Sequence, residues 1–275
     1  MLTSIVQLTD THIRQAGQLA YGRLDTAPYL QEAVQSIASL RQAPQAVIMT
    51  GDLTDFGRPE EYQHLRALLA PLGIPFYLMP GNHDNRDQLR AAFPDHEYLG
   101  SAGFIQYTVD IGPLRLITLD TCVAGKSHGE LCGNRLDWLE EELKNSTDRP
   151  VIIAMHHPPF GTLIGHMDEI GLLAGAPHLE KIVARHSNVE RIVCGHLHRP
   201  IETRFGGTIA ATAPGPAHQV TLNLAPDAES DWMLEPPAFR IHAWNAQEHR
   251  LVTHTAVIGS WPGPFPFHEN GVLID

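Results

Sequence analysis

The 275-residue sequence has few basic side chains and no long apolar run. It contains 19 lysine and arginine residues against 31 aspartate and glutamate residues, a formal net charge of −12. Binding to polymeric nucleic acid depends on a basic surface, so this charge argues against a nucleic-acid-binding protein. No stretch approaches the roughly 20 apolar residues that are needed to cross a bilayer. We therefore expect no membrane segment and no polymeric nucleic-acid partner.

Cysteine is also scarce. The three cysteines, Cys122, Cys132 and Cys194, are too few and odd in number for a disulfide framework, which is typical of a reducing cytoplasm. We interpret each of them as a small buried apolar residue. Residues 1–8 have no basic segment and lead directly into Thr9-Asp10, which predicts a first strand and not a signal peptide. The predicted location is the cytoplasm.

Histidine, in contrast, is abundant, with 17 residues in the chain. It is the commonest metal ligand in proteins and titrates near neutral pH. This surplus makes metal binding a hypothesis that the positions of the histidines must decide.

Short β-rich runs alternate with amphipathic helical runs in the first third of the chain. Strands are predicted at 4–8, 46–49 and 75–79, with helices at 27–40, from Pro59 onward and at 87–93. This βαβαβ order favours a parallel sheet with helices on its faces.

The rest of the chain is richer in predicted strands. It contains a hairpin of 104–109 and 114–119, a helix at 135–143, a strand at 151–154, a helix at 179–185 and a strand at 189–194. Further strands are predicted at 202–205, 208–212, 220–224, 239–244 and 251–256. Two stacked sheets covered by helices fit this pattern better than one open sheet.

We expect the chain to divide into a core, 1–218, and a C-terminal part, 219–275, whose strands complete the fold. The C-terminal part also holds an acidic, proline-bounded loop at 226–237, which exposes Trp232 and Met233, and a proline- and aromatic-rich tail at 261–267 that cannot be helical. Such a tail packs either on a neighbouring subunit or on its own chain. We expect a homo-oligomer, a dimer or higher.

Five polar clusters each follow a predicted strand. They are Asp10-Thr11-His12, Gly51-Asp52, Gly81-Asn82-His83-Asp84, His156-His157 and Gly195-His196-Leu197-His198. In α/β sheets, the carboxyl ends of parallel strands line the crevice where ligands bind. We therefore expect the clusters to meet at one rim, although they are spread over almost 190 residues.

The residue types are suited to two neighbouring metal ions. Asp10 and His12 can reach one ion from the same turn, and the two oxygens of Asp52 can bridge two ions. Asn82 supplies a neutral amide oxygen, a weaker ligand that leaves its ion more Lewis-acidic. Glycine before Asp52 permits the close approach of loops that this arrangement requires.

Each cluster also has a purely structural interpretation. Asp-x-His and Gly-Asp are common at strand ends, and two adjacent histidines such as His156-His157 are more often one core and one surface residue. Gly-Asn-His-Asp is much more specific, and Gly-His-x-His is intermediate. The occurrence of all five in this order leaves little room for a structural explanation.

This ordered set resembles the calcineurin-like metallophosphoesterase superfamily from Leu8 to about His198, and no ligand of the pattern is missing. Tyr21-Gly22, the run from Arg58 to Tyr62 and the run from Pro214 to Val220 are most similar to bacterial glycerophosphodiesterases and class III cyclic-nucleotide phosphodiesterases.

The resemblance implies a four-layer α-β-β-α sandwich with a small C-terminal cap or oligomerisation segment. It implies two divalent ions, one held by Asp10, His12, Asp52 and His198, the other by Asp52, Asn82, His156 and His196. His83 would be the catalytic residue that faces the substrate. His218 and Tyr21 would lie near the substrate, and Asp55 and Phe56 would shape its pocket.

We hypothesise that a hydroxide between the ions attacks phosphorus and that His83 protonates the leaving oxygen. Asp84 either orients His83 or caps the following helix, and His157 supports His156 or packs behind it. Ligation by nitrogen and oxygen without sulfur suits iron, manganese, zinc or cobalt.

The charges of the expected ions and their ligands favour a diester substrate. Two divalent ions, two carboxylates and a hydroxide leave about one positive charge, which matches a diester, and only Arg86 and Arg199 are basic residues next to the clusters. The expected function is hydrolysis of 3′,5′-cyclic nucleotides or glycerophosphodiesters. The alternatives are a phosphomonoesterase or protein phosphatase of the same fold, a nuclease, and a non-catalytic interaction scaffold.

Overall fold

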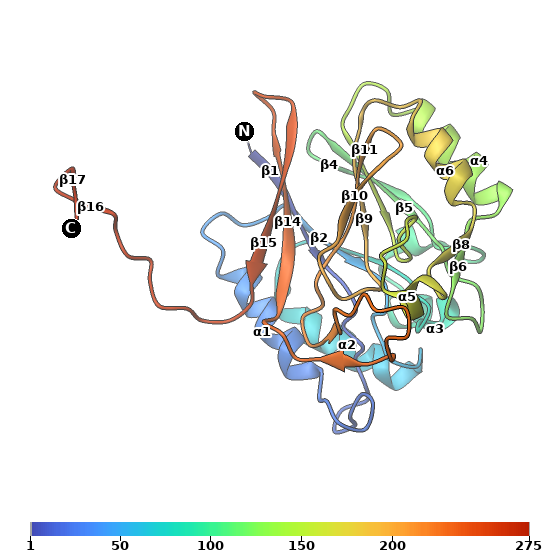
Figure 1. Ribbon diagram of the computed structural model, residues 1–275, viewed down its shortest axis with the longest axis horizontal. Helices are drawn as coiled ribbons and strands as arrows, with labels where there is room; N and C mark the ends of the chain where they lie inside the picture. Colours follow the sequence, from blue (N-terminus) through green and yellow to red (C-terminus); the bar gives the residue numbers. More distant parts are fainter. Residues whose placement is uncertain (1, 275) are drawn as a thin grey trace.

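The computed structural model describes residues 2–274, in which two β-sheets face each other between two layers of helices (Figure 1). This is the four-layer α-β-β-α arrangement that the resemblance implied. Among the described residues, no helix has the length and apolar character needed to cross a membrane.

The first sheet has the strand order β15-β14-β1-β2-β3. Its strands are β1 (Leu2–Leu8), β2 (Ala46–Thr50), β3 (Phe76–Met79), β14 (Ala238–Asn245) and β15 (Arg250–Val257). The three N-terminal strands are parallel, as predicted, whereas β14 pairs antiparallel with β1 and with β15. Helices α1 (Ala27–Ala38), α2 (Pro59–Leu69) and α3 (Arg86–Ala92) belong to this half of the molecule, with 3-10 turns at Ala70–Leu72 and Glu97–Leu99.

The second sheet has the order β10-β11-β9-β7-β5-β4. Its strands are β4 (Thr108–Ile111), β5 (Leu114–Leu119), β7 (Val151–Met155), β9 (Val189–Cys194), β10 (Glu202–Phe205) and β11 (Thr208–Thr212). The four central strands are parallel and the two edge strands are antiparallel to their neighbours. Helices α4 (Gly133–Lys144) and α6 (Ala176–Val183) cover its outer face.

Short elements surround these sheets. Two-stranded pairs are formed by β6 (Gly129–Glu130) with β8 (Leu172–Ala174), β12 (Gln219–Val220) with β13 (Trp232–Met233), and β16 (His268–Glu269) with β17 (Val272–Leu273). A one-turn helix, α5, covers Gly165–Asp168. The last pair lies at the end of a tail that extends away from the sandwich (Figure 1).

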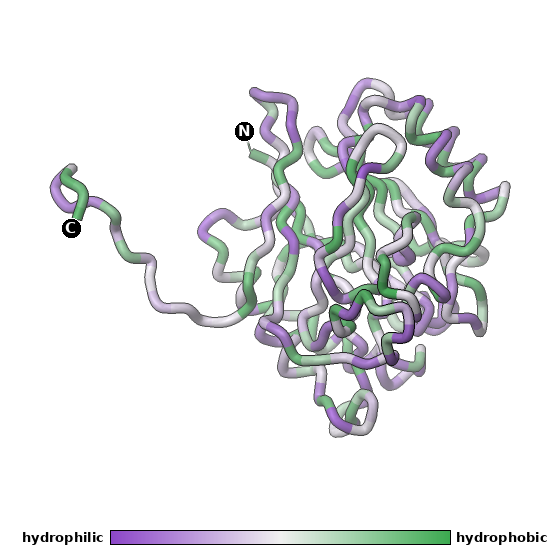
Figure 2. Tube along the Cα trace, viewed as in Figure 1, coloured by the Kyte–Doolittle hydropathy of each residue, from purple (hydrophilic) through white to green (hydrophobic). Residues whose placement is uncertain are grey.

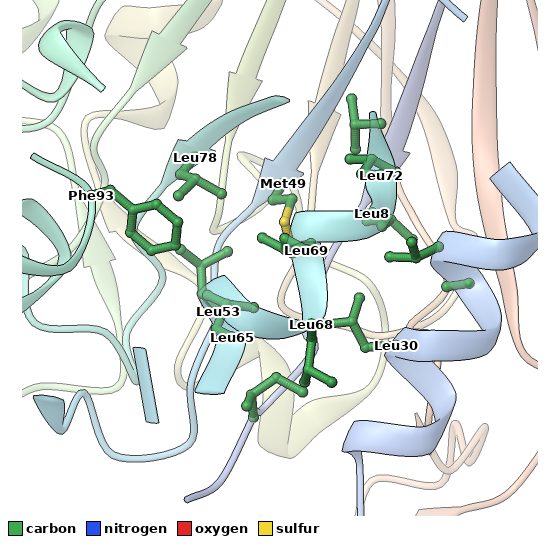
Figure 3. Close-up of a cluster of buried hydrophobic side chains, with 14 of the residues drawn as sticks. Leu8, Leu30, Met49, Leu53, Leu65, Leu68, Leu69, Leu72, Leu78 and Phe93 are labelled. Atoms are coloured by element: carbon green, nitrogen blue, oxygen red, sulfur yellow. The ribbon is translucent and has the colours of Figure 1, made fainter. Parts of the chain in front are cut away.

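Strand periodicity explains the layering. On β1, Val6 and Leu8 pack with the leucines of α1 and α2, whereas Ile5 points between the sheets towards residues such as Ile152 of β7. Successive side chains of a strand point to opposite faces, so a strand buried on both faces is apolar throughout. Figure 3 shows the helix-side cluster, and Figure 2 shows the hydrophobic strands inside more polar helices and loops.

Three expectations about local structure were wrong. Residues 104–107 precede β4 and are not a strand, because the backbone N–H groups of Ile105 and Tyr107 donate to the Asp120 carboxylate and the Thr118 hydroxyl. The strand predicted at 220–224 stops at Val220, and Leu222 beyond it is 58% exposed. Cys132 is exposed, whereas Cys122 and Cys194 are buried free thiols as expected.

Candidate metal centre

The five polar clusters lie in the loops that follow β1, β2, β3, β7 and β9, at one rim of the sandwich. Backbone hydrogen bonds join these loops: the Asp10 N–H donates to the Gly51 carbonyl, and the Gly195 N–H donates to the His156 carbonyl, each at 3.0 Å. Parallel strands bring their carboxyl ends together, and the facing sheets bring the two halves together. The predicted convergence is therefore present.

The backbone is strained at this rim. Nine non-glycine residues in the described chain have a positive φ, and six of them are predicted site residues: Asp10, His12, Tyr21, Asp52, His196 and His198. Such a left-handed conformation costs of order 1–3 kcal/mol at each non-glycine residue and persists where the surroundings impose it. Five of the six are predicted metal ligands, so the strain is concentrated in the loops that aim these side chains.

One group of side chains brings lone pairs face to face. The Nε2 atoms of His12 and His198 are 3.3 Å apart, and the His198 Nε2 is 3.4 Å from an Asp10 oxygen. The Nδ1 atom of His198 lies 3.1 Å from the His218 carbonyl, and the Nδ1 of His12 lies 3.2 Å from the Asp55 carboxylate. These acceptors require an N–H at each Nδ1, which leaves a lone pair at each Nε2 in the neutral ring. These lone pairs repel one another, and a cation placed between them would be bound by both.

A second group has the same character. The Nδ1 of His156 donates to the Thr50 carbonyl at 2.8 Å, so its Nε2 presents a lone pair to the Asn82 amide oxygen at 3.1 Å and to an Asp52 oxygen at 3.4 Å. The Nε2 of His196 is buried and has no hydrogen-bond partner among the described residues. Buried polar atoms are rarely left without a partner, and a metal ion would supply one here.

Burial opposes charge on several of these groups. It raises the pKa of Asp10 to about 6, with a further raising effect from Asp52, and it lowers the pKa of His196 to about 3, with help from His156. Two aspartates and several imidazoles are thus held where water does not solvate them. Divalent cations balance the carboxylates and bind neutral imidazoles, so the residues present fit metal ions.

Close packing requires glycine at position 81. A Cβ atom there would collide with the backbone and carboxylate of Asp52, and it would lie 2.8 Å from the Cε1 of His156. The glycine therefore lets the loop after β3 approach the Asp52 loop closely enough for Asn82 to reach the same space as Asp52 and His156.

His83 lies at the surface of the site, with about a third of its side chain exposed. Its Nδ1 donates to the Asp55 carbonyl at 2.8 Å, and its ring contacts that of His12 edge to face, with 4.7 Å between centroids. The fixed Nδ1 leaves Nε2 as the nitrogen available to a ligand. His83 lines a cavity of about 220 Å³ together with His12, Asp52, Asn82, His196 and His198.

Asp84 has neither of the two roles considered from the sequence. Its carboxylate accepts hydrogen bonds from the backbone N–H groups of Leu53 and Gly81 and from the Tyr62 hydroxyl. The cap of α3 is instead Asn85, which accepts from the N–H groups of residues 87 and 88. Asp84 therefore fastens the loop after β3 to the loop that carries Asp52.

His157 packs behind the site. Its Nδ1 lies 2.8 Å from the Thr121 hydroxyl and its Nε2 lies 3.0 Å from the Ser127 carbonyl, while its ring contacts that of His156 edge to face. Both nitrogens are engaged, which fits the supporting position that was expected for it.

Tyr21 and His218 form one wall of the cavity. The His218 Nε2 lies 3.2 Å from the Tyr21 hydroxyl, and its ring is 4.5 Å from that of His198. His218 also forms a possible three-imidazole group with His12 and His198. Trp232, expected on an exposed loop, is half-buried and packs against Tyr21 at 5.5 Å between ring centroids.

Asp55 and Phe56 do not line this cavity. The buried Asp55 carboxylate bonds to His12 and Arg14. Phe56 is 55% exposed and lies beneath the guanidinium groups of Arg14 and Arg58. Their predicted influence on the substrate would therefore be indirect.

Several cavity residues were not predicted: Ser127, His166, Met167, Ile170, Val220, Ser230, Asp231 and Trp232. Val220 ends the run from Pro214 to Val220, but the others come from loops and short elements without a motif, so local sequence patterns do not identify them. The only signal was the acidic, aromatic-bearing segment 226–237, which was interpreted as a surface loop.

The two arginines that adjoin the clusters are both engaged with carboxylates. Arg86 forms a two-pronged ion pair with Asp120 at 2.6 and 2.7 Å, and Arg199 pairs with Glu235 at 2.8 Å. Neither lines the cavity. The charge that faces a ligand therefore comes from the carboxylates and whatever cations they hold.

Comparisons with known proteins agree with this geometry. The sequence model of calcineurin-like phosphoesterases matches residues 3–200. The chain is 39% identical to a probable glycerophosphodiester phosphodiesterase, GpdQ, of Arcobacter nitrofigilis, over 98% of this chain and 99% of the relative. It is 36% identical to a probable cyclic nucleotide phosphodiesterase of Rhodopseudomonas palustris, over 98% and 97% respectively. A dimetal phosphatase from Danio rerio has a similar fold, with a TM-score of 0.62 and 16% identity over 94% of this chain and 99% of that one.

Proposed function

We propose that this chain, which belongs to the calcineurin-like phosphoesterase family, is a metal-dependent enzyme that hydrolyses small phosphodiesters. The proposal rests on one observation. Imidazole nitrogens, an amide oxygen and carboxylate oxygens converge at the cavity, and the histidine tautomers leave no proton between them. The similarity to GpdQ and to cyclic nucleotide phosphodiesterases supports the diesterase assignment. The substrates proposed are glycerophosphodiesters and 3′,5′-cyclic nucleotides.

We assign two divalent ions, iron, manganese, zinc or cobalt, to the two groups of side chains. Asp10, His12, Asp52 and His198 would hold one, and Asp52, Asn82, His156 and His196 the other. When bound, such a pair supplies a nucleophile from water at neutral pH and offsets negative charge on the phosphoryl oxygens. The backbone carbonyls of Thr50 and His218 and the Asp55 carboxylate fix the tautomers of the ligating histidines.

His83 is assigned as the proton donor to the leaving oxygen. The Asp55 carbonyl holds its Nδ1–H, and an Asp55 carboxylate oxygen lies 3.8 Å from the same nitrogen. Both groups orient the ring so that its Nε2 faces the cavity, where it would pass a proton to the leaving oxygen. Its partial exposure allows the ring to be reprotonated from solvent after each turnover.

A diester fits the charge of the site better than a monoester dianion. No free arginine or lysine lines the cavity among the described residues, because Arg86 and Arg199 are paired with Asp120 and Glu235 outside it. A second negative charge on the phosphoryl group would therefore lack a side-chain partner.

We also propose that the chain is a homo-oligomer. Trp261, Phe265 and Phe267 of the tail are 64%, 76% and 82% exposed, and the tail leaves the sandwich (Figure 1). Large apolar side chains gathered on one exposed segment commonly mark a protein contact. We expect a second copy of this chain to cover these side chains.

The metal requirement is tested by measuring metal content and hydrolysis of bis(p-nitrophenyl) phosphate before and after chelation. We expect the activity to be lost with the metal and restored by adding divalent ions. Full activity in a metal-free sample would overturn the proposal.

The choice of ester is tested by comparing bis(p-nitrophenyl) phosphate with p-nitrophenyl phosphate at equal metal loading. We expect a higher kcat/KM for the diester. A strong preference for the monoester would assign the chain to the phosphomonoesterases of the same fold, and a panel of cyclic nucleotides and glycerophosphodiesters then identifies the alcohol.

A further inference from the structure

A second cavity of about 690 Å³ lies outside the metal centre, between the edges of the two sheets. Its wall includes the start of β9, the turn between β10 and β11, and the start of β15. The metal centre adjoins the opposite, carboxyl end of β9. Arg191 and His196 are five residues apart on this path, a span of roughly 16 Å for extended chain.

Three arginines line this cavity: Arg191, Arg204 and Arg250. Arg204 is aligned with Ile209 of β11, and Ile209 is aligned with Arg191 of β9. Residues in register on neighbouring strands point to the same face, so the two arginines flank Ile209, about 10 Å apart at the backbone. Arg250 adds a third guanidinium from the other sheet.

Arg191 is a buried cation without a partner. It is 8% exposed, its Nε is fully buried without a hydrogen bond, and it makes no ion pair within the described chain. Arg14, Arg86 and Arg240, in contrast, are each paired with a carboxylate. Burial lowers the pKa of Arg191, but an arginine stays charged at neutral pH.

The carboxylates of the cavity do not neutralise these arginines. Glu180 and Glu190 line the same space, but neither forms an ion pair with Arg191, Arg204 or Arg250 in the described chain. Glu202, whose charge also acts on Arg191, is paired with Arg240. An unpaired guanidinium in a buried position is costly, and its planar array of N–H groups matches the oxygens of a phosphate group.

We propose that this cavity is a second, metal-independent anion site that binds a phosphate-bearing dianion between Arg191, Arg204 and Arg250. The anion supplies the partner that Arg191 lacks, and the cavity has room for an ester group on the phosphate. The site does not depend on the proposed metal centre, because no predicted metal ligand lines it.

The proposal is tested by calorimetric titration of the metal-loaded protein with inorganic phosphate and, separately, with glycerol 3-phosphate. We expect two bound equivalents of phosphate, one at the metals and one in this cavity. In Arg191→Met, the second equivalent should bind about tenfold or more weakly, because a hydrogen-bonded charge is lost. Tighter binding of glycerol 3-phosphate than of phosphate would extend the site to esters, and equal binding would assign it to the phosphate group alone.

Two further variants make the test decisive. Arg204→Met changes an exposed residue of the same row, so it is informative even if Arg191→Met fails to fold. Arg41→Met is the matched control, because Arg41 is exposed and does not line the cavity. Inhibition of diester hydrolysis by phosphate reports on the metal centre and should be unchanged in all three variants. Phosphate binding by the wild type in which no bound equivalent is weakened by either Arg191→Met or Arg204→Met would overturn the second site.

Discussion

At the residue scale, the site depends on the hydrogen bonds that orient its side chains as much as on the types of residue present. Three histidines are held by fixed acceptors, His12 by the Asp55 carboxylate, His156 by the Thr50 carbonyl and His198 by the His218 carbonyl. Each acceptor holds a proton on Nδ1 and leaves Nε2 free for a metal ion. His83 has the same Nδ1 arrangement but stands at the cavity surface, which is why it is assigned to the leaving group.

Replacement of His83 by alanine should lower kcat by roughly 10²–10⁴ with a poor leaving group, because the alkoxide then departs without a proton. The loss should be much smaller with a p-nitrophenol leaving group, which needs no protonation. Steady-state kinetics on a methyl and a p-nitrophenyl diester, at measured equal metal content, make the comparison. Equal losses on both substrates would assign His83 to binding and not to proton transfer.

A buried histidine that does not line the metal-site cavity links stability to pH. His242 lies between Gln7, 3.1 Å from its Nε2, and the Thr253 hydroxyl, 2.9 Å from its Nδ1. Burial, with the nearby charges of Arg191 and Arg240, lowers its pKa to about 3. The folded pKa lies below the unfolded value of about 6.5, so the stability contributed by neutral His242 is complete above pH 6.5 and is lost as the pH falls towards 3.

The variant His242→Gln should be less stable than the wild type at pH 7.5, and this difference should shrink below pH 6.5. The expected slope is at most about 1.4 kcal/mol per pH unit, the value for one proton. Urea unfolding of both proteins between pH 7.5 and 5 measures it. A difference in the free energy of unfolding that stays constant over this range would contradict the assignment.

At the element scale, the loops after the strands matter more than the strands. The strands β1, β2, β3, β7 and β9 are largely apolar and mostly buried, and they bring five loops to one rim. The loops then adopt left-handed conformations at Asp10, His12 and Asp52, among others, to aim their side chains. The rigid sandwich sustains this local strain.

Substitution of Gly81 by alanine should displace the loop after β3, because the added methyl group collides with Asp52. We expect lower metal content and a loss of diester hydrolysis of at least tenfold. Gly133→Ala is the matched control: Gly133 lies at the start of α4 with open space around it, so activity should be unchanged. Metal analysis and kcat/KM on both variants give the result, and a fully active Gly81→Ala enzyme would contradict this account of the loop packing.

At the scale of the whole molecule, each proposed function has its own part of the surface. One rim carries the metal centre, the opposite part of β9 adjoins the arginine-lined cavity, and the C-terminal tail projects from the body with its aromatics exposed (Figure 1). The single strand β9 connects the first two of these regions.

Deletion of residues 261–275 should reduce the mass of the assembly in solution, because it removes Trp261, Phe265 and Phe267, the exposed apolar side chains of the tail. Sedimentation velocity at micromolar protein concentration compares the truncated and full-length chains. Diester hydrolysis serves as the control for folding of the sandwich. An unchanged mass would place the subunit contact elsewhere or show that the tail has no such role.

The sequence alone determined the order of the main elements, the position of the five clusters at strand ends and the kinds of metal-binding side chain that the clusters contain. Hydrophobic periodicity and chemical type are local properties, so they can be inferred from neighbouring residues. The strand expected at 220–224 was wrong because strand formation also needs a partner, and the partner strand β13 has only two residues.

Only the tertiary structure decided how distant segments meet. Tyr21 and Trp232 pack together at the cavity wall, Asp84 fastens one loop to another, and Arg191 and Arg204 align through the register of three strands. None of these contacts leaves a local pattern, because each depends on the packing of chain segments that lie far apart in sequence or in different elements. The ligand types were therefore set by local chemistry, and the shape of the space around them was set by packing.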